Sequence, residues 1–252
     1  MLRVYLTGRM TIEAGGVVLV PGDFPGQQGR NAFAFLAGEA GTPVSRSVLA
    51  DALWASEQPP ARDSALNAIV SKLRTLLGRA GMDGGAVLRS SGGCYELRLP
   101  AGTWVDVDDA ADSIHMAEAA LRAGEPARAY GPSAVAHHIA RRPFLPGEEA
   151  PWIELRRAKL ASILVRALEC RAEVYLWNGE HALAVEAARD AVTLRPFRES
   201  AYRLLMRAHV AAGNSGEALR VYERCRRVIS AELGVNPSPE TRALCDEVLR
   251  AL

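Results

Sequence analysis

The amino-acid sequence predicts an α+β region at the N-terminus, followed by an all-α region. Three observations support this fold class. Short apolar runs alternate with turn residues over the first 25 positions, as in a small antiparallel sheet. The apolar period then becomes helical, and a second pair of short strands follows between residues 87 and 99. From residue 105 onward nearly every segment has helical periodicity.

The first elements are predicted to be short strands. Their apolar residues are Leu2, Val4 and Leu6, then Met10 and Ile12, then the run 17–20. Gly15 and Gly16 lie between the last two runs, and a Gly-Gly pair is typical of a hairpin turn. We therefore expect an antiparallel sheet, followed by a turn-rich stretch over residues 21–29.

Three helices are expected next. Residues 32–40 have one apolar face, and Gly41 and Pro43 end it. Ser45 is a suitable N-cap for a helix over 46–54 because its hydroxyl can accept a backbone hydrogen bond. Pro59-Pro60 cannot lie inside a helix. A longer helix then begins at about Arg62, with an apolar stripe at Leu66, Ile69, Val70, Leu73, Leu76 and Leu77.

A hairpin closes the N-terminal region. Its strands are 87–89 and 95–99, and its turn is 90–93, which reads Ser-Ser-Gly-Gly. The order sheet, helix, helix, long helix, hairpin is that of a winged helix. Residues 100–103 are the predicted boundary, so we expect a winged-helix domain over 1–100 and a helical domain over 101–252.

The C-terminal region is predicted to contain seven helices, at about 107–123, 126–141, 150–178, 181–194, 197–212, 215–232 and 238–251. Gly179 and Gly213 are 34 positions apart, and the same offset separates Ala184 from Ala218. A period of about 34 residues is the tetratricopeptide repeat length, in which each helical pair buries its apolar face on its neighbours. We expect a tetratricopeptide-like (TPR-like) domain.

Composition excludes several classes of protein. The chain has 252 residues, a net charge of +1, 49% hydrophobic residues and four widely spaced cysteines. The start MLRVYLTGRM is not a secretory signal, and no apolar run approaches the roughly 20 residues that span a membrane. We expect a cytoplasmic protein without membrane attachment.

No enzyme site can be assembled from the motifs. A phosphate-binding loop is excluded because neither Lys72 nor Lys159 follows a glycine, and no GxSxG or HExxH motif occurs. His137 and His138 are adjacent, so on a helix they point about 100° apart. A helix dipole favours carboxylates at a helix start, which explains the acidic run Asp106, Asp108, Asp109 and Asp112. We expect no catalysis, no cofactor and no metal.

The long helix and the hairpin after it form the candidate nucleic-acid site. Between positions 60 and 98 the sequence contains six basic residues and three acidic ones, which is a local excess of positive charge. Phosphate contacts are expected from Arg62, Lys72, Arg79, Arg89 and Arg98, and base contacts from Asn67, Ser71 and Arg74, with Ser90 near the hairpin tip. Alone, the helix also fits an ordinary amphipathic helix with a solvated polar face. The order of the elements favours the winged helix.

A second hypothesis assigns the function to the helical region, as a module that senses a ligand or binds a protein while DNA binding is weak. The near-neutral charge favours it. Its candidate groove residues are the aromatic side chains Trp152, Tyr175, Trp177 and Tyr202, although aromatic residues at helical spacing are more often part of a core.

Several runs resemble one family. They are Arg3-Val4, Pro43-Val44-Ser45-Arg46, Leu53-Trp54 with Pro59-Pro60, and the stretch ALNAIVSKLRTLLG at 65–78. In the second half, the runs RPFRE at 195–199, GEALRVYE at 216–223 and ELGVNPSPET at 232–241 are similar to a companion helical domain. Together they resemble the Streptomyces antibiotic regulatory protein (SARP) family, with its OmpR-type winged helix and bacterial transcriptional activator domain.

The resemblance implies an activator that binds direct repeats in double-stranded DNA near promoters as a homodimer, and that recruits RNA polymerase. The loop 55–61 corresponds to the segment that contacts polymerase or its sigma subunit, so Ser56, Glu57 and Gln58 are candidate contacts. Larger members of the family carry ATPase modules, so the chain is expected to be a short stand-alone form. Its sequence departs from the family at 27–31 and at Asp63 and Thr75, where more basic residues are common.

Overall fold

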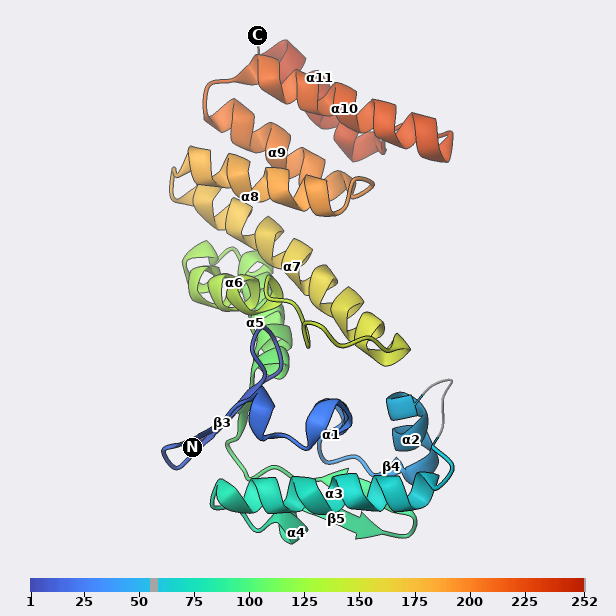
Figure 1. Cartoon of the computed structure of the whole chain (residues 1–252). Helices are drawn as coiled ribbons and strands as arrows, with labels where there is room; N and C mark the ends of the chain where they lie inside the picture. Colours follow the sequence, from blue (N-terminus) through green and yellow to red (C-terminus); the bar gives the residue numbers. More distant parts are fainter. Residues whose placement is uncertain (55–58, 252) are drawn as a thin grey trace. The chain divides into compact units, whose positions relative to one another are not determined.

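The structure is a computed structural model of the chain, and it describes residues 1–54 and 59–251 (Figure 1). The candidate polymerase contacts Ser56, Glu57 and Gln58 lie outside the described residues. Two compact units are present. The first, here called the N-terminal unit, comprises Met1–Asp109 and Arg142–Leu160, and the second, the helical unit, comprises Ala110–Arg141 and Ala161–Leu252. The predicted domain boundary at residue 100 stays a prediction.

A four-stranded sheet in the order β3-β2-β1-β7 begins the N-terminal unit. Its strands are β1 (Leu2–Tyr5), β2 (Thr11–Ala14), β3 (Val17–Leu19) and β7 (Trp104–Val105). The three predicted strands pair antiparallel, whereas β7 runs parallel to β1, with Val4 opposite Val105. β7 was not predicted, because two residues are too few to show an alternating pattern.

The helices of the N-terminal unit are α1 (Gly26–Ala37), α2 (Arg46–Trp54), α3 (Arg62–Arg79) and the short α4 (Gly84–Val87), and a 3₁₀ turn, η1 (Pro21–Asp23), precedes them. Residues 21–29 were predicted to be a turn-rich stretch. This prediction was wrong for residues 26–29, because α1 already begins at Gly26. Glycine and glutamine at this start carry no apolar period that would have indicated a helix. Ser45 accepts from the backbone N–H of Val48 at 3.2 Å, as an N-cap should.

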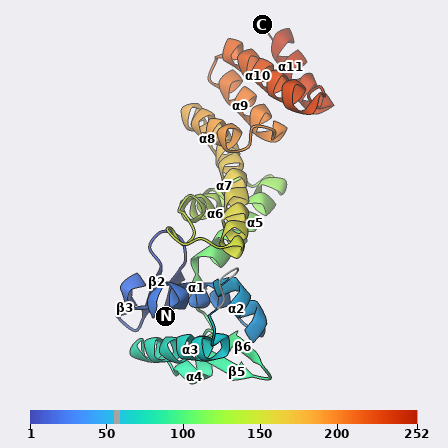
Figure 2. The same ribbon diagram turned by 45° about the vertical axis from the view of Figure 1, so that its right-hand side comes forward.

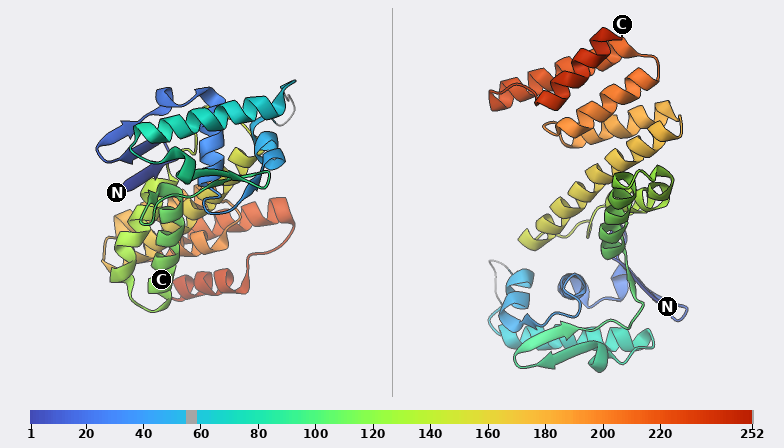
Figure 3. Two further views of the ribbon diagram at one scale, coloured as in Figure 1. Left: turned by 90° about the horizontal axis from the view of Figure 1, so that it is seen from below. Right: turned by 180° about the vertical axis from the view of Figure 1, so that it is seen from behind.

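A second sheet has the order β4-β6-β5, with β4 (Val44–Ser45), β5 (Leu88–Ser91) and β6 (Cys94–Leu97). β5 and β6 form the predicted hairpin. Its turn is shorter than expected, because Ser90 and Ser91 are paired within β5 and only Gly92 and Gly93 have positive φ. The sheet and α3 lie together, as the view from below shows most clearly (Figure 3).

One buried carboxylate joins the start of the chain to the segment about 100 residues later. Asp106, the first residue of α5 (Asp106–Arg122), is fully buried. Its carboxylate accepts the backbone N–H of Leu6 at 2.9 Å, the backbone N–H of Thr7 at 2.9 Å and the Thr7 hydroxyl at 2.7 Å. The helix dipole, by which Asp106 was explained from the sequence, gave no indication that this carboxylate is buried in the core.

The helical unit contains residues of α5 and of α6 (Pro126–Ala140) and α7 (Pro151–Trp177), together with α8 (His181–Leu194), α9 (Glu199–Ala211), α10 (Ser215–Leu233) and α11 (Pro239–Arg250). All seven predicted helices are present, each with ends within two residues of the prediction. α8 packs on α9, α9 on α10, and α10 on α11 (Figure 2). Within the described part of the chain, no helix is both long and apolar enough to span a bilayer.

Candidate nucleic-acid interface

Helix α3 has one buried face and one exposed face. The buried side chains are Leu66, Val70, Leu73, Leu76 and Leu77, which match the predicted stripe except for the half-buried Ile69. The exposed positions are Ser64, Asn67, Ala68, Ser71, Lys72 and Thr75, together with Asp63 near the start of the helix and Gly78 and Arg79 at its end. Most of these side chains are short, so another surface can approach the helix closely along this face.

Asn67 belongs to a polar cluster that joins three elements. Its side-chain oxygen accepts from Arg46 Nη2 at 2.9 Å and from the Tyr95 hydroxyl at 3.0 Å. The Arg46 guanidinium also stacks over the Tyr95 ring, 5.3 Å from its centroid. Burial raises the pKa of Tyr95, so its hydroxyl stays protonated and can donate. Asn67 is therefore held at the surface of α3 with its amide nitrogen available for a further acceptor.

Arg74 fixes the hairpin against α3. Its Nε donates to the carbonyl oxygen of Leu88 at 2.9 Å, and its Nη2 donates to the Ser90 hydroxyl at 2.7 Å. α4 approaches the same part of α3 so closely that a Cβ at Gly84 would collide with the Arg74 backbone. Arg74 thus sets the distance between the helix and β5, a role that its sequence position does not reveal.

The four arginines among the predicted phosphate contacts have intramolecular partners. Arg62 donates to the Ser47 carbonyl at 2.8 Å and pairs with Asp51 at 3.1 Å. The other arginine contacts are Arg79 with Asp23 at 2.8 Å, Arg98 with Glu96 at 2.6 Å, and Arg89 Nε with the Ala86 carbonyl at 3.3 Å. A backbone hydrogen bond from Val20 and then the bond from Arg79 lower the pKa of Asp23.

Lys72 and Ser71 lie at the middle of the exposed face. The Lys72 ammonium has no hydrogen bond or ion pair with the described residues, and the Ser71 carbonyl accepts from the Thr75 hydroxyl at 3.2 Å. The structure thus places Asn67, Ser71 and Lys72 on one face, and Arg74 and Ser90 at the junction with the hairpin. Sequence reasoning missed Arg46 and Tyr95. Tyr95 was predicted only as a residue of a hairpin strand, and that pattern did not indicate its bond to Asn67.

The aromatic residues proposed for a groove in the helical region do not form one. Tyr175 and Tyr202 are buried in the core of the helical unit, and Trp177 is 60% exposed. Trp152 belongs to the N-terminal unit, where its indole N–H donates to the Ala52 carbonyl at 3.0 Å. The hypothesis of an aromatic groove was therefore wrong, because helical spacing placed two of these rings in the core.

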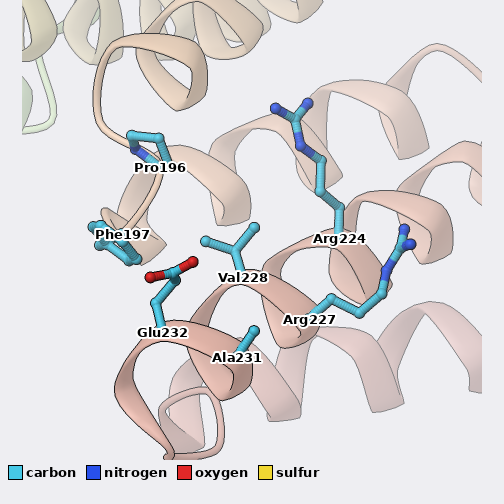
Figure 4. A pocket seen from close by; sticks show the side chains of 7 residues that line it. All are labelled: Pro196, Phe197, Arg224, Arg227, Val228, Ala231 and Glu232. Carbon is cyan, nitrogen blue, oxygen red and sulfur yellow. The ribbon is translucent and has the colours of Figure 1, made fainter.

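An open groove of about 630 Å³ does occur elsewhere in the helical unit (Figure 4). Pro196 and Phe197 lie on one side of it and Arg224 and Arg227 on the other, with Val228 between them. Phe197 is 51% exposed. Among the described residues, no group of three or more histidine, cysteine, aspartate or glutamate side chains could hold a metal ion.

Comparison with known proteins supports the same architecture. The bacterial transcriptional activator domain matches residues 105–249. The regulatory protein AfsR of Streptomyces coelicolor is 32% identical over 99% of this chain, which spans 24% of AfsR. The transcriptional regulatory protein EmbR of Mycobacterium tuberculosis is 30% identical over 96% of the chain, which spans 61% of EmbR.

A solved structure agrees over nearly the whole chain. Mycobacterium tuberculosis EmbR in complex with a low-affinity phosphopeptide superimposes with a TM-score of 0.88 and 26% identity, covering 99% of this chain and 65% of EmbR. The fold class is confirmed: a winged helix followed by a TPR-like helical domain. The chain belongs to the bacterial transcriptional activator domain family, as a member of the Streptomyces antibiotic regulatory proteins.

Proposed function

We propose that the chain is a sequence-specific regulator of transcription that binds double-stranded DNA, with α3 in the major groove. The exposed face of α3 carries this proposal. Its polar side chains are mostly short, Lys72 has no partner among the described residues, and the hairpin beside the helix is fixed by Arg74. The 18-residue helix is about 27 Å long at about 1.5 Å per residue, and a major groove about 12 Å wide admits it.

The side chains divide into two roles. Asn67 and Ser71 face outward from α3 and are assigned to base edges, where an asparagine amide can pair with adenine. Lys72, Arg79, Arg89 and Arg98 are assigned to phosphates, together with Arg62 at the start of the helix. The pairs Arg79–Asp23 and Arg98–Glu96 involve arginines that are more than half exposed. Such surface pairs stabilise a fold by only about 0–1 kcal/mol, so a phosphate can replace the carboxylate.

Arg74 is assigned both to the hairpin and to the bases. Its two bonds to β5 use only part of the guanidinium, which has five N–H groups. The proposal extends to the family's mode of action in the cytoplasm: homodimers on direct repeats, and recruitment of RNA polymerase and its sigma subunit through residues 55–61.

The test is selection of binding sites from random double-stranded DNA by the purified chain, followed by affinity measurements across a salt series. Lys72→Ala is compared with Lys159→Ala. These are the two lysines of the chain, and Lys159 is also exposed but lies on α7. Lys72→Ala should weaken binding to selected and random DNA alike and reduce the salt slope by about 0.9. Lys159→Ala should leave both unchanged.

Selection that yields no motif, together with no binding of random DNA at low salt, would contradict the proposal. Equal losses in the two lysine variants would instead show that DNA contacts an undirected positive surface rather than α3.

A second candidate function is supported by the groove in Figure 4. Apolar surface at Phe197 lies opposite Arg224 and Arg227, with Val228 between them, and Glu232 is the one acidic side chain in the lining. This charge distribution suits a protein segment with both acidic and large apolar side chains. Selection from a displayed library of random peptides would test it. Acidic, apolar sequences should be enriched on the wild type and lost on Arg224→Glu/Arg227→Glu.

A further inference from the structure

A second open cavity lies wholly within the N-terminal unit and has a volume of about 510 Å³. This is within the range of about 300–1,000 Å³ typical of small-molecule sites. Its lining comes from three parts of the chain: the turn 8–10, the segment 21–30 and the loop 145–148. The apolar lining residues are Met10, Pro21, Leu145 and Pro146, and the charged ones are Arg9, Arg30 and Glu148.

Glu148 is a buried carboxylate that is only half satisfied. The residue is 5% exposed, and its Oε1 accepts from Arg30 Nε at 3.0 Å and from Arg30 Nη2 at 2.7 Å. Its other oxygen, Oε2, is buried and has no hydrogen-bond partner among the described residues. Buried polar atoms are nearly always paired, so an unpaired oxygen on a side chain that lines a cavity indicates a site for a donor.

The loop that carries Glu148 is held in a strained conformation. Leu145 has φ of 41°, a left-handed value that side chains other than glycine rarely adopt, and other described residues with positive φ are all glycines. Arg157 fixes this loop by donating to the carbonyl oxygens of Phe144, Leu145 and Glu148 at 2.8–3.0 Å. Strain of this kind persists only where neighbours enforce it, and it concentrates at ligand-binding sites.

The cavity also offers positive charge. Arg9 is exposed, and its guanidinium has no hydrogen bond or ion pair with the described residues. Arg30 uses its Nε and Nη2 on Glu148, and no bond from its Nη1 is present within the described chain. Two arginines and one glutamate in the same lining therefore suit a ligand that is anionic and also has a hydrogen-bond donor.

We propose that this cavity binds a small organic acid with an amino or hydroxyl group beside its carboxylate and an apolar side chain. The carboxylate would pair with Arg9 and Arg30, the amino or hydroxyl group would donate to Glu148, and the apolar part would pack on Leu145 and Pro146. α-Amino acids and α-hydroxy acids share this chemistry. The proposal is independent of DNA binding, because no residue of the cavity belongs to the exposed face of α3 or to the hairpin.

The test measures the thermal midpoint of the purified chain with each of the twenty L-amino acids and their 2-hydroxy analogues, each at 10 mM. Matched probes are the acids without the amino or hydroxyl group, the corresponding amines without the carboxylate, and sodium chloride at equal ionic strength. At least one apolar amino or hydroxy acid should raise the midpoint by several degrees. The matched acid, the amine and the salt should not.

Two variants connect the response to the cavity. Arg9→Ala should weaken the affinity for the best compound at least tenfold by calorimetry, and its fold should be unchanged because Arg9 has no partner in the described chain. Arg3→Ala, on the exposed side of β1, is the matched control and should stay within twofold of the wild type. Glu148→Gln keeps an oxygen for Arg30 but should remove the preference for compounds with an ammonium group. If no compound raises the midpoint, or if Arg9→Ala and Glu148→Gln respond as the wild type does, the proposed site is wrong.

Discussion

The two units are stabilised in different ways. In the N-terminal unit, side chains join segments that are far apart in the sequence, such as Asp106 with Leu6 and Thr7, or Arg156 with Gly38 and Glu39. In the helical unit, α8 packs on α9, α9 on α10 and α10 on α11, so these contacts join helices that follow one another in the chain. In a stack of helices, stability is the sum of many contacts between neighbouring helices. In a unit whose segments are joined by a few long-range contacts, stability depends more strongly on single residues. Substitutions at single residues of the two units test this difference.

Asp106→Ala should destabilise the N-terminal unit by about 3–5 kcal/mol, because it removes three hydrogen bonds and leaves two backbone N–H groups buried without an acceptor. Hydrogen exchange should become faster at Leu6 and Thr7 and throughout β1. Asp112→Ala, an exposed carboxylate on α5, is the matched control and should have almost no effect. If hydrogen exchange became faster only at residues 106–112, the Asp106 carboxylate would not be what holds β1 in the N-terminal unit.

Arg74→Ala should cost about 1–3 kcal/mol in binding free energy on the selected DNA site and should relax specificity at one base position. It should also speed hydrogen exchange in β5, because the bonds to Leu88 and Ser90 are lost. Arg89→Ala is the comparison, since it should weaken binding to all sequences alike. Affinity measurements on selected and random DNA separate the two, and identical behaviour of both variants would show the assigned roles to be wrong.

Glu118 and Arg166 form a two-bond ion pair within the helical unit, at 2.6 Å for each bond. The hydrogen bonds from Arg166 lower the pKa of Glu118 in the folded chain. The pair therefore stabilises the fold above the unfolded carboxyl pKa of about 4.3, and this contribution is lost as the pH falls through the lower folded value. Glu118→Gln should reduce the fall in thermal midpoint between pH 5 and 3 by about 2–4 °C, if the pair contributes about 1 kcal/mol. If Glu118→Gln left the fall in thermal midpoint between pH 5 and 3 unchanged, the ion pair would not contribute to the stability of the helical unit.

Tyr202→Phe should change the free energy of unfolding by the smallest amount, and it should stabilise the chain where the other substitutions weaken it. The Tyr202 hydroxyl is buried without a hydrogen-bond partner among the described residues, and burial raises its pKa. Because removing an unsatisfied group removes its desolvation cost, the variant should be stabilised by up to about 1 kcal/mol. Denaturant unfolding of this variant and of Tyr222→Phe, a half-buried control, makes the comparison. Destabilisation of Tyr202→Phe by more than that amount would indicate a partner that the packing does not reveal.

The sequence predicted the local structure of the helical unit well and that of the N-terminal unit in part. The ends of all seven C-terminal helices, the Ser45 cap and the hairpin follow from periodicity, turn residues and capping chemistry, which are local properties. It also placed Asn67, Ser71 and Lys72 on the exposed face of α3, because the apolar stripe fixes the opposite side.

Contacts between distant segments could not be predicted in this way. Asp106 looked like one of four similar acids at a helix start, yet it alone of that run is fully buried. Residues 142–160 belong to the N-terminal unit although the sequence runs on through helical segments on both sides of them. The partners of Asn67 and Arg74 likewise depend on how α3, β5 and β6 pack, which no pattern within one element encodes.

The close approach of α4 to α3 also limits how this region can vary in evolution. Any side chain at Gly84 would meet the backbone of Arg74, so even alanine would have to push α4 and the start of β5 away. Gly85, its neighbour, faces only the flexible Asp83 carboxylate at 3.4 Å and has no such limit. Related proteins that keep the same spacing between α3 and the hairpin should therefore nearly always have glycine at the position of Gly84, whereas the position of Gly85 should vary.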